Sequence, residues 1–205
     1  MIATDTSPVN QRARIITLRI VALAVIPLII FSTPAWGVDS LALEFFENVG
    51  ILLLIAGVIG RLWSILYAGG RKNKTIVQIG PYSISRHPLY MFSTLAVLGL
   101  GMMLGSVVLT ILLTGTVFLI LRSTAQREEK HLRAKFGPVY DEYAARVPQI
   151  IPSPFAYVST QEVTVDVRAF HRTIVDAMSF LMLIPFAEFV EILREVQSIP
   201  HFVIW

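Results

Sequence analysis

The sequence predicts an all-α integral membrane protein built around four core transmembrane helices. The chain has 205 residues, of which 55% are hydrophobic and only 15% charged, whereas charged residues make up roughly a quarter of a soluble domain. Charge-poor runs that approach the roughly 20 residues needed to cross a bilayer recur along the chain. We therefore expect a membrane helical bundle with a cytoplasmic helical segment and a C-terminal amphipathic or fifth membrane helix.

The first two spans are the longest. A cytoplasmic tail of residues 1–14 precedes the first span, expected near 15–36, and the second is expected near 45–67. The first run has basic residues before it, as in a secretion signal. It has no clean small-x-small cleavage site, however, and further spans follow it, which favours a retained membrane anchor.

The third and fourth spans are predicted to form a short helical hairpin. The runs 89–104 and 107–121 are short for membrane spans, and Gly105 and Ser106 separate them, which indicates a tight turn. Glycines in the second and third spans and at this turn are expected to permit close helix packing. They are Gly57, Gly60, Gly99, Gly101 and Gly105.

Polar and mixed segments follow the fourth span. The pattern over 122–143 indicates an amphipathic helix that leaves the membrane and turns at Phe136-Gly137-Pro138. The core domain is expected to cover 15–152, with an interfacial or membrane helical extension over 153–205. Within that extension the apolar run 177–187 is short for a span. We expect a helix that lies on the inner membrane face or packs against a second subunit, or a tilted fifth span.

The positions of the lysines and arginines predict the orientation. They lie before the first span, between the second and third, and after the fourth, whereas the loops 37–44 and 105–106 carry none. The positive-inside rule then places both polar segments, 69–90 and 122–152, in the cytoplasm. We expect a multi-pass protein of a prokaryotic inner membrane with its active site facing the cytoplasm. The net charge of +3 needs no nucleic acid as partner, because basic residues at the inner leaflet are attracted to anionic lipid.

Two polar blocks lie at the membrane boundary. The first runs from Gly80-Pro81-Tyr82 to Arg86-His87-Pro88-Leu89-Tyr90, and the second from Glu128-Glu129 to Arg146-Val147-Pro148. The intervening hairpin returns the chain to the same side of the membrane, so we expect the two blocks to meet. Pro88 in the first turn of the third helix would leave that helix N-terminus open to an anion.

These motifs, in this order and spacing, resemble the isoprenylcysteine carboxyl methyltransferase family over roughly residues 60 to 152. The resemblance implies a membrane methyltransferase that uses S-adenosyl-L-methionine and takes a lipid or lipophilic acceptor from the membrane. It also implies a cofactor site formed by both blocks and the preceding loop. The residues concerned are Lys74, Thr75, Ile76, Val77, Tyr82, His87, Pro88, Leu89, Tyr90 and Glu128.

The two glutamates are expected to differ in role. Glu128 matches the family glutamate that contacts the cofactor, and we expect it to bind ribose hydroxyls or the ammonium group. Glu129 is expected to be structural. For the pair of glutamates, the alternative to a functional role is local ion pairs with Arg122, Lys130 or Arg133.

The chain departs from the family at one position. The eukaryotic enzymes carry an arginine one helical turn before the cofactor glutamate, implied to hold the substrate carboxylate, and Thr124 stands there in this chain. Arg122 and Arg127 flank it, and either is expected to reach a substrate anion. Isoprenylcysteine-carboxylate-like O-methylation is favoured. A phospholipid amine or a thiol acceptor stays open.

Two other classes of function compete with methyl transfer. Sterol reductases, which use NADPH, have similar His-Pro and Tyr motifs but are expected to be longer, with additional spans. A non-catalytic membrane assembly protein would function without His87 or Glu128. No metal site is predicted, because the four histidines show no ligand spacing and the chain has no cysteine. The pattern leaves the oligomeric state open and is compatible with a homo-oligomer.

Overall fold

The fold is known from a computed structural model, which describes residues 16, 20, 27, 32–34, 40–68, 75–182, 184–185, 189 and 202–204. Within these residues the fold is helical, apart from one parallel pairing of two short strands, β1 (Ser32–Pro34) and β2 (Phe202–Ile204). The predicted tail 1–14 and most of the first predicted span, 15–36, lie outside the described residues, and so does Lys74.

Three long helices and four shorter elements make up the rest of the described fold. They are α2 (Leu41–Ala68), α3 (Pro81–Ile84), α4 (Pro88–Met103), α5 (Val107–Phe136), α6 (Pro138–Arg146), the 3-10 turn η1 (Pro154–Ala156) and α7 (Val167–Leu181). By length and composition α2 and α5 can each cross a membrane, and α4 is a shorter apolar helix of 16 residues. The all-α class is therefore confirmed for the described residues, and the arrangement of four spans stays a prediction.

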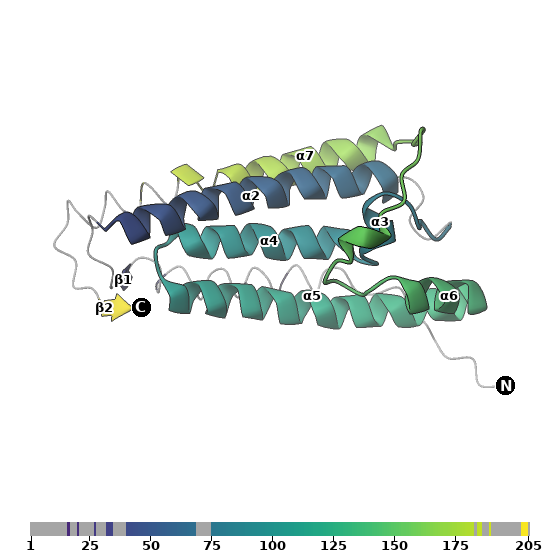
Figure 1. Cartoon of the computed structure of the whole chain (residues 1–205), viewed down its shortest axis with the longest axis horizontal. Helices are drawn as coiled ribbons and strands as arrows, with labels where there is room; N and C mark the ends of the chain where they lie inside the picture. The colour runs from purple at the N-terminus through teal and green to yellow at the C-terminus, as the bar shows by residue number, and fades with distance from the viewer. Residues whose placement is uncertain are drawn as a thin grey trace.

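Close packing of α2 against α4 forms the centre of the bundle, and the predicted role of the glycines is confirmed there. A Cβ atom added at Gly57 would lie 2.6 Å from the backbone nitrogen of Ala96, and one at Gly50 would lie 2.7 Å from the carbonyl oxygen of Gly99. Glycine at these positions allows the two backbones to approach each other directly. Figure 1 shows α4 between α2 and α5, with α7 along the outer side of α2.

The hairpin between α4 and α5 is confirmed, but α5 is longer than the predicted fourth span. Gly105 forms the turn with a φ of +71°, and the Ser106 hydroxyl accepts a hydrogen bond from the Leu109 amide at 3.2 Å, which caps α5. The predicted fourth span and the predicted polar helix are one continuous helix that ends at Gly137, whose φ is +56°. The predicted turn near residue 137 is confirmed.

The C-terminal extension differs from the prediction in its helix boundaries. The helix α7 begins at Val167, ten residues before the apolar run 177–187, and it ends within that run. Ala177 is fully buried in a cluster with Leu54 and Val58 of α2. The described part of the extension therefore packs along α2 of the same chain. A membrane crossing by α7 stays a prediction.

Candidate active site

The two polar blocks meet at one end of the bundle, as predicted. Arg86 and His87 lie between α3 and α4, and Glu128 and Glu129 lie on the polar half of α5. The Arg86 Nε atom donates to Glu129 Oε1 at 3.0 Å, and His87 Nε2 lies 3.2 Å from the same oxygen. His87 Nδ1 lies 3.7 Å from Glu128 Oε2. One imidazole therefore contacts both carboxylates.

Glu129 is the more buried of the two carboxylates and the centre of an ion-pair network. Its side chain is 5% exposed, against 18% for Glu128. Burial alone would raise the pKa of Glu129, but hydrogen bonds from His87 and Gln149 and the charge of Arg86 outweigh it and lower this pKa to about 2. The carboxylate is therefore ionised at neutral pH. Arg133, one turn along α5, adds a contact at 3.8 Å, so one of the expected local ion pairs is confirmed.

Arg86 connects this network to the end of α6. Its Nη1 atom donates to the carbonyl oxygens of Ala144 at 2.6 Å and Val147 at 2.8 Å. Its backbone amide donates to the Pro148 carbonyl at 2.9 Å. Arg86 is not among the sequence-predicted site residues. Arg86 could have been predicted as the ion-pair partner of the two adjacent carboxylates of the second block, because it is the basic residue next to the histidine of the first block.

His87 occupies the N-cap position of α4, with Pro88 in the first turn as predicted. Its ring stacks on that of Tyr90, with centroids 5.4 Å apart and ring planes 3° apart. Both side chains are buried, and Leu89 between them is half-buried. No side chain caps this helix N-terminus, which leaves it suited to an anion.

Tyr82 comes to the same place from α3. Its carbonyl oxygen accepts a hydrogen bond from the Tyr143 hydroxyl at 2.7 Å. Burial raises the pKa of Tyr82, and the neighbouring Tyr143, Glu128 and Tyr90 raise this pKa further, so the phenol stays protonated at neutral pH. Tyr82, His87, Tyr90 and Glu128 thus form one cluster, which we call the polar cluster. Tyr143, which sequence reasoning did not assign to the site, supports it.

The predicted cofactor loop reaches only the edge of this region. Ile76 packs against the tyrosines of α6, in a group that includes Tyr140 and Tyr143. Val77 is half-buried and Thr75 is exposed. The loop therefore lies beside the α6 tyrosines that support the polar cluster.

The two arginines predicted to hold a substrate anion lie on the exposed surface of α5. Arg122 and Arg127 are both exposed. The buried face of α5 instead carries Thr124, whose hydroxyl donates to the Ile120 carbonyl at 2.8 Å. The position of the family's substrate arginine therefore points inward with a small side chain, whereas both flanking arginines are exposed.

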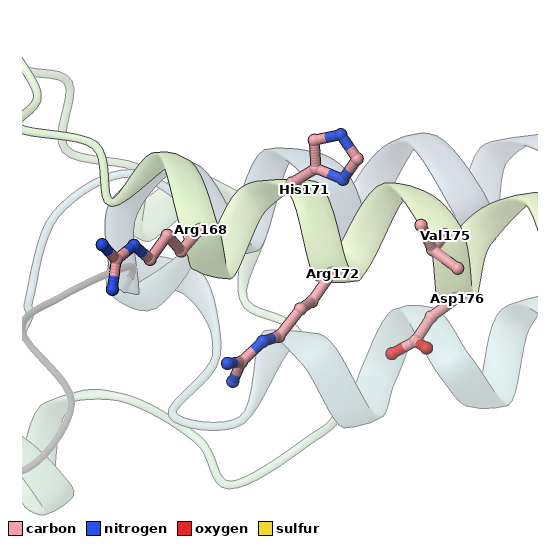
Figure 2. A pocket seen from close by; sticks show the side chains of 5 residues that line it. All are labelled: Arg168, His171, Arg172, Val175 and Asp176. Carbon is pink, nitrogen blue, oxygen red and sulfur yellow. The ribbon is translucent and has the colours of Figure 1, made fainter.

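A cavity of about 520 Å³ lies elsewhere, along α7. Figure 2 shows its lining, which comes from α7 alone: Arg168, His171, Arg172, Val175 and Asp176. None of the predicted site residues lines it, and a recess with one helix as its wall is open to its surroundings. Among the described residues, no three His, Asp or Glu side chains gather as metal ligands. The polar cluster is therefore the candidate active site.

Comparisons with known proteins match the part of the chain that forms this site. The phospholipid methyltransferase family matches residues 46–139, which contain both His87 and Glu128. Protein-S-isoprenylcysteine O-methyltransferase B of Arabidopsis thaliana is 30% identical over 118 residues, 53% of this chain and 60% of the plant protein. Over this part the chain resembles the isoprenylcysteine-methyltransferase-like membrane methyltransferases.

The chain also has relatives that match most or nearly all of its length. The nickel-cobalt-cadmium resistance protein NccN of Alcaligenes xylosoxydans xylosoxydans is 33% identical over 94% of this chain and 90% of its own. The cobalt-zinc-cadmium resistance protein CzcN of Cupriavidus metallidurans is 36% identical over 84% of this chain and 79% of its own. No solved structure matches the chain.

Proposed function

We propose that the protein is a membrane-embedded, S-adenosyl-L-methionine-dependent methyltransferase that acts on a lipophilic acceptor. The observation that carries this proposal is the meeting of His87 and Glu128 beside the uncapped N-terminus of α4. This meeting lies at the end of the apolar helices, where a water-soluble cofactor and a membrane-borne acceptor have access to the same place. The match of residues 46–139 to the phospholipid methyltransferase family and the similarity to the Arabidopsis enzyme support it independently.

The side chains of the polar cluster fit the charges of this cofactor. The helix N-terminus suits the methionine carboxylate, and Glu128 suits the ammonium group or the ribose hydroxyls. The rings of Tyr82 and Tyr90 offer flat faces for the adenine or for a cation. When bound, the cofactor supplies an electrophilic methyl group on a positively charged sulfur. Arg86 and Glu129 neutralise each other in an ion pair, so cofactor binding does not depend on either of their charges.

The protein's own contribution is positioning. Glu129 and the Tyr90 ring fix the His87 imidazole, so that Nδ1 faces Glu128. A carboxylate acceptor is already ionised at neutral pH and needs no general base, so placing it in line with the methyl group is sufficient. An amine acceptor must first lose a proton, and Glu128 or His87 would receive it.

We favour an isoprenylcysteine-like carboxylate as the acceptor, with a phospholipid amine or a thiol as the alternatives. The similarity to the Arabidopsis enzyme supports the carboxylate. The buried Thr124 in place of the family's arginine weakens the match, and the role of Arg122 and Arg127 stays a prediction. The basic residues at the polar end support a multi-pass arrangement in a prokaryotic inner membrane, with the site in the cytoplasm.

Two relatives that match most of the chain have names that suggest the cellular process in which this activity is used. Because these relatives are metal-resistance proteins, we propose that methyl transfer serves resistance to divalent transition metals. A non-catalytic role in such a system is the second candidate. It predicts that a strain carrying Glu128→Ala keeps wild-type growth in cadmium or cobalt, whereas the catalytic proposal predicts loss of resistance.

The deciding experiment is calorimetric binding of S-adenosylmethionine and S-adenosylhomocysteine to the detergent-purified protein. We expect micromolar binding by the wild type and at least a tenfold loss in Glu128→Ala and in His87→Ala, because each change removes a contact of the polar cluster. Glu142→Ala is the matched control, since that carboxylate is exposed on α6. A wild-type protein that is folded, as judged by circular dichroism, yet binds neither compound would overturn the proposal.

A further inference from the structure

The chain that connects α6 to α7 contains a long segment without charge. No charged residue occurs over 147–161, although α6 before it and residues 162–172 after it carry several. Large apolar side chains in this segment face outward: Ile151 is 73% exposed, Val158 is 51% exposed and Phe155 has no contact that reduces its exposure. Such a group of exposed apolar side chains marks a surface that binds something apolar.

Contacts with three helices fix the level of this segment along the bundle. The Tyr157 ring packs on Trp63, near the end of α2, with centroids 5.9 Å apart. Ile150 packs with Tyr90, in the first turn of α4, and with Leu121, the last apolar residue before Arg122 on α5. On α4 and α5 this is the level at which apolar sequence meets polar sequence, and on α2 it lies close to the end of the helix.

Hydrogen bonds hold the segment in place, so its apolar side chains cannot fold back into the core. The Gln149 carbonyl accepts from the His87 amide at 3.0 Å, and the Ser153 amide donates to the Ile84 carbonyl at 2.9 Å. Farther along, the Val158 carbonyl accepts from the Gly80 amide at 2.8 Å. The segment is thus fastened to the first polar block at both of its ends.

We propose that residues 147–158, the interfacial loop, insert Ile151 and Phe155 into the lipid surface and so hold the polar cluster at the bilayer boundary. Lipid is the occupant that the chemistry favours, since the loop has no charge with which to select a protein partner. It also lies at the level of the apolar boundary, where aromatic side chains are enriched in membrane proteins. Both α2 and α5 also carry exposed apolar residues, such as Ile59 and Leu119.

The chain has no cysteine, so single nitroxide labels can be placed without background. We would introduce Ile151→Cys and Phe155→Cys in separate full-length proteins and reconstitute them in liposomes of phosphatidylethanolamine and phosphatidylglycerol. Collision with oxygen, which concentrates in the bilayer, would be compared with collision with a water-soluble nickel chelate. We expect both labels to favour oxygen, and the label at exposed Glu142→Cys on α6 to favour the chelate.

Two outcomes would overturn the proposal. Labels at 151 and 155 that collide with the nickel chelate as readily as the label at 142 would place the loop in water. Labels shielded from both reagents would show that a protein surface covers the loop, such as a second copy of this chain. The labels report depth and not methyl transfer, so failure of the proposed catalytic function would leave this result interpretable. Circular dichroism of each variant would verify that it folds.

Discussion

His87 lies between two carboxylates that have different surroundings. This difference gives Glu129 a supporting role and leaves Glu128 for ligand binding. Glu129 has Arg86, His87 and Arg133 around it, so its charge is compensated by the protein. Glu128 is more exposed and faces Tyr82 and the uncapped end of α4. We infer that a ligand ammonium or hydroxyl would meet Glu128 first.

A change of pH should reveal the contribution of Glu129 to stability. Its folded-state pKa of about 2 lies below the ordinary value of 4.5, so the ionised form stabilises the fold above about pH 4.5. This contribution is lost as the pH falls from there towards 2. Glu129→Gln should therefore lower the free energy of unfolding at pH 7 by about 3 kcal/mol. The difference from wild type should shrink at pH 3.

Chemical unfolding in detergent at pH 7 and pH 3 would measure this difference. Glu142→Gln, which changes an exposed carboxylate on α6, should leave stability unchanged at both values. A Glu129→Gln effect of equal size at both pH values would contradict the assignment, because a neutral carboxyl group would then account for it.

The sequence predicted the members of the polar cluster better than it predicted the residues that hold them in place. Motif order placed His87 and Glu128 together, and the structure brings them together. The main contacts of Arg86 are backbone carbonyls at Ala144 and Val147. Any residue type presents such a carbonyl, so no pattern of side chains could have indicated these contacts.

At the scale of the helices, hydropathy located the membrane-facing parts and failed at their ends. The run 107–121 marks the apolar half of α5, but the helix continues to Phe136 because backbone hydrogen bonding does not depend on side-chain polarity. In the same way α2 begins at Leu41 instead of 45, because the Ser40 hydroxyl accepts from the Leu43 amide at 3.2 Å and starts the helix. Capping residues set the helix ends, and hydropathy does not detect them.

The contact between α2 and α4 predicts the effect of a single methyl group. A Cβ atom at Gly57 would lie 2.6 Å from the Ala96 nitrogen and 2.7 Å from the Phe92 carbonyl oxygen. Both are backbone atoms, so relief requires the helices to separate. We expect Gly57→Ala to destabilise the protein by about 1–3 kcal/mol.

Gly115→Ala on α5 is the matched control, because its added Cβ would meet nothing within 4 Å. It should be neutral or slightly stabilising, since alanine favours a helix over glycine by about 1 kcal/mol. Thermal unfolding in detergent would compare the two variants. Equal unfolding temperatures would show that α2 and α4 do not pack as closely as described.

At the scale of the whole molecule, both polar blocks, α3, α6 and the start of α7 gather at one end (Figure 1). The positive-inside rule predicted this common end from the positions of lysine and arginine. The course of α7 could not be predicted in the same way. Its contact with α2 depends on Ala177 fitting against Leu54 and Val58. The helical spacing of apolar residues along α7 indicates a face to be buried, but it does not say which helix covers that face.

This arrangement predicts which parts of the chain face each side of the membrane. Leu41, at the start of α2, is 84% exposed, and Gln161 is exposed near the start of α7, at the other end of the bundle. In a bacterial host, Leu41→Cys should react with a membrane-impermeant maleimide in intact spheroplasts. Gln161→Cys should react only in inside-out vesicles. Reaction of both from the same side would contradict a membrane crossing by α2.

The hydrogen bonds between the first polar block and the interfacial loop also set an order of assembly during synthesis. The amides of Arg86 and His87 find their acceptors at Pro148 and Gln149, which the ribosome adds 62 residues later. Until then α2, α4 and the apolar half of α5 can already occupy the bilayer, while the His-Pro segment lacks these partners. A nascent chain that stops before Gln149 would therefore hold its helices without a finished ligand site, and the site becomes competent only when the loop arrives.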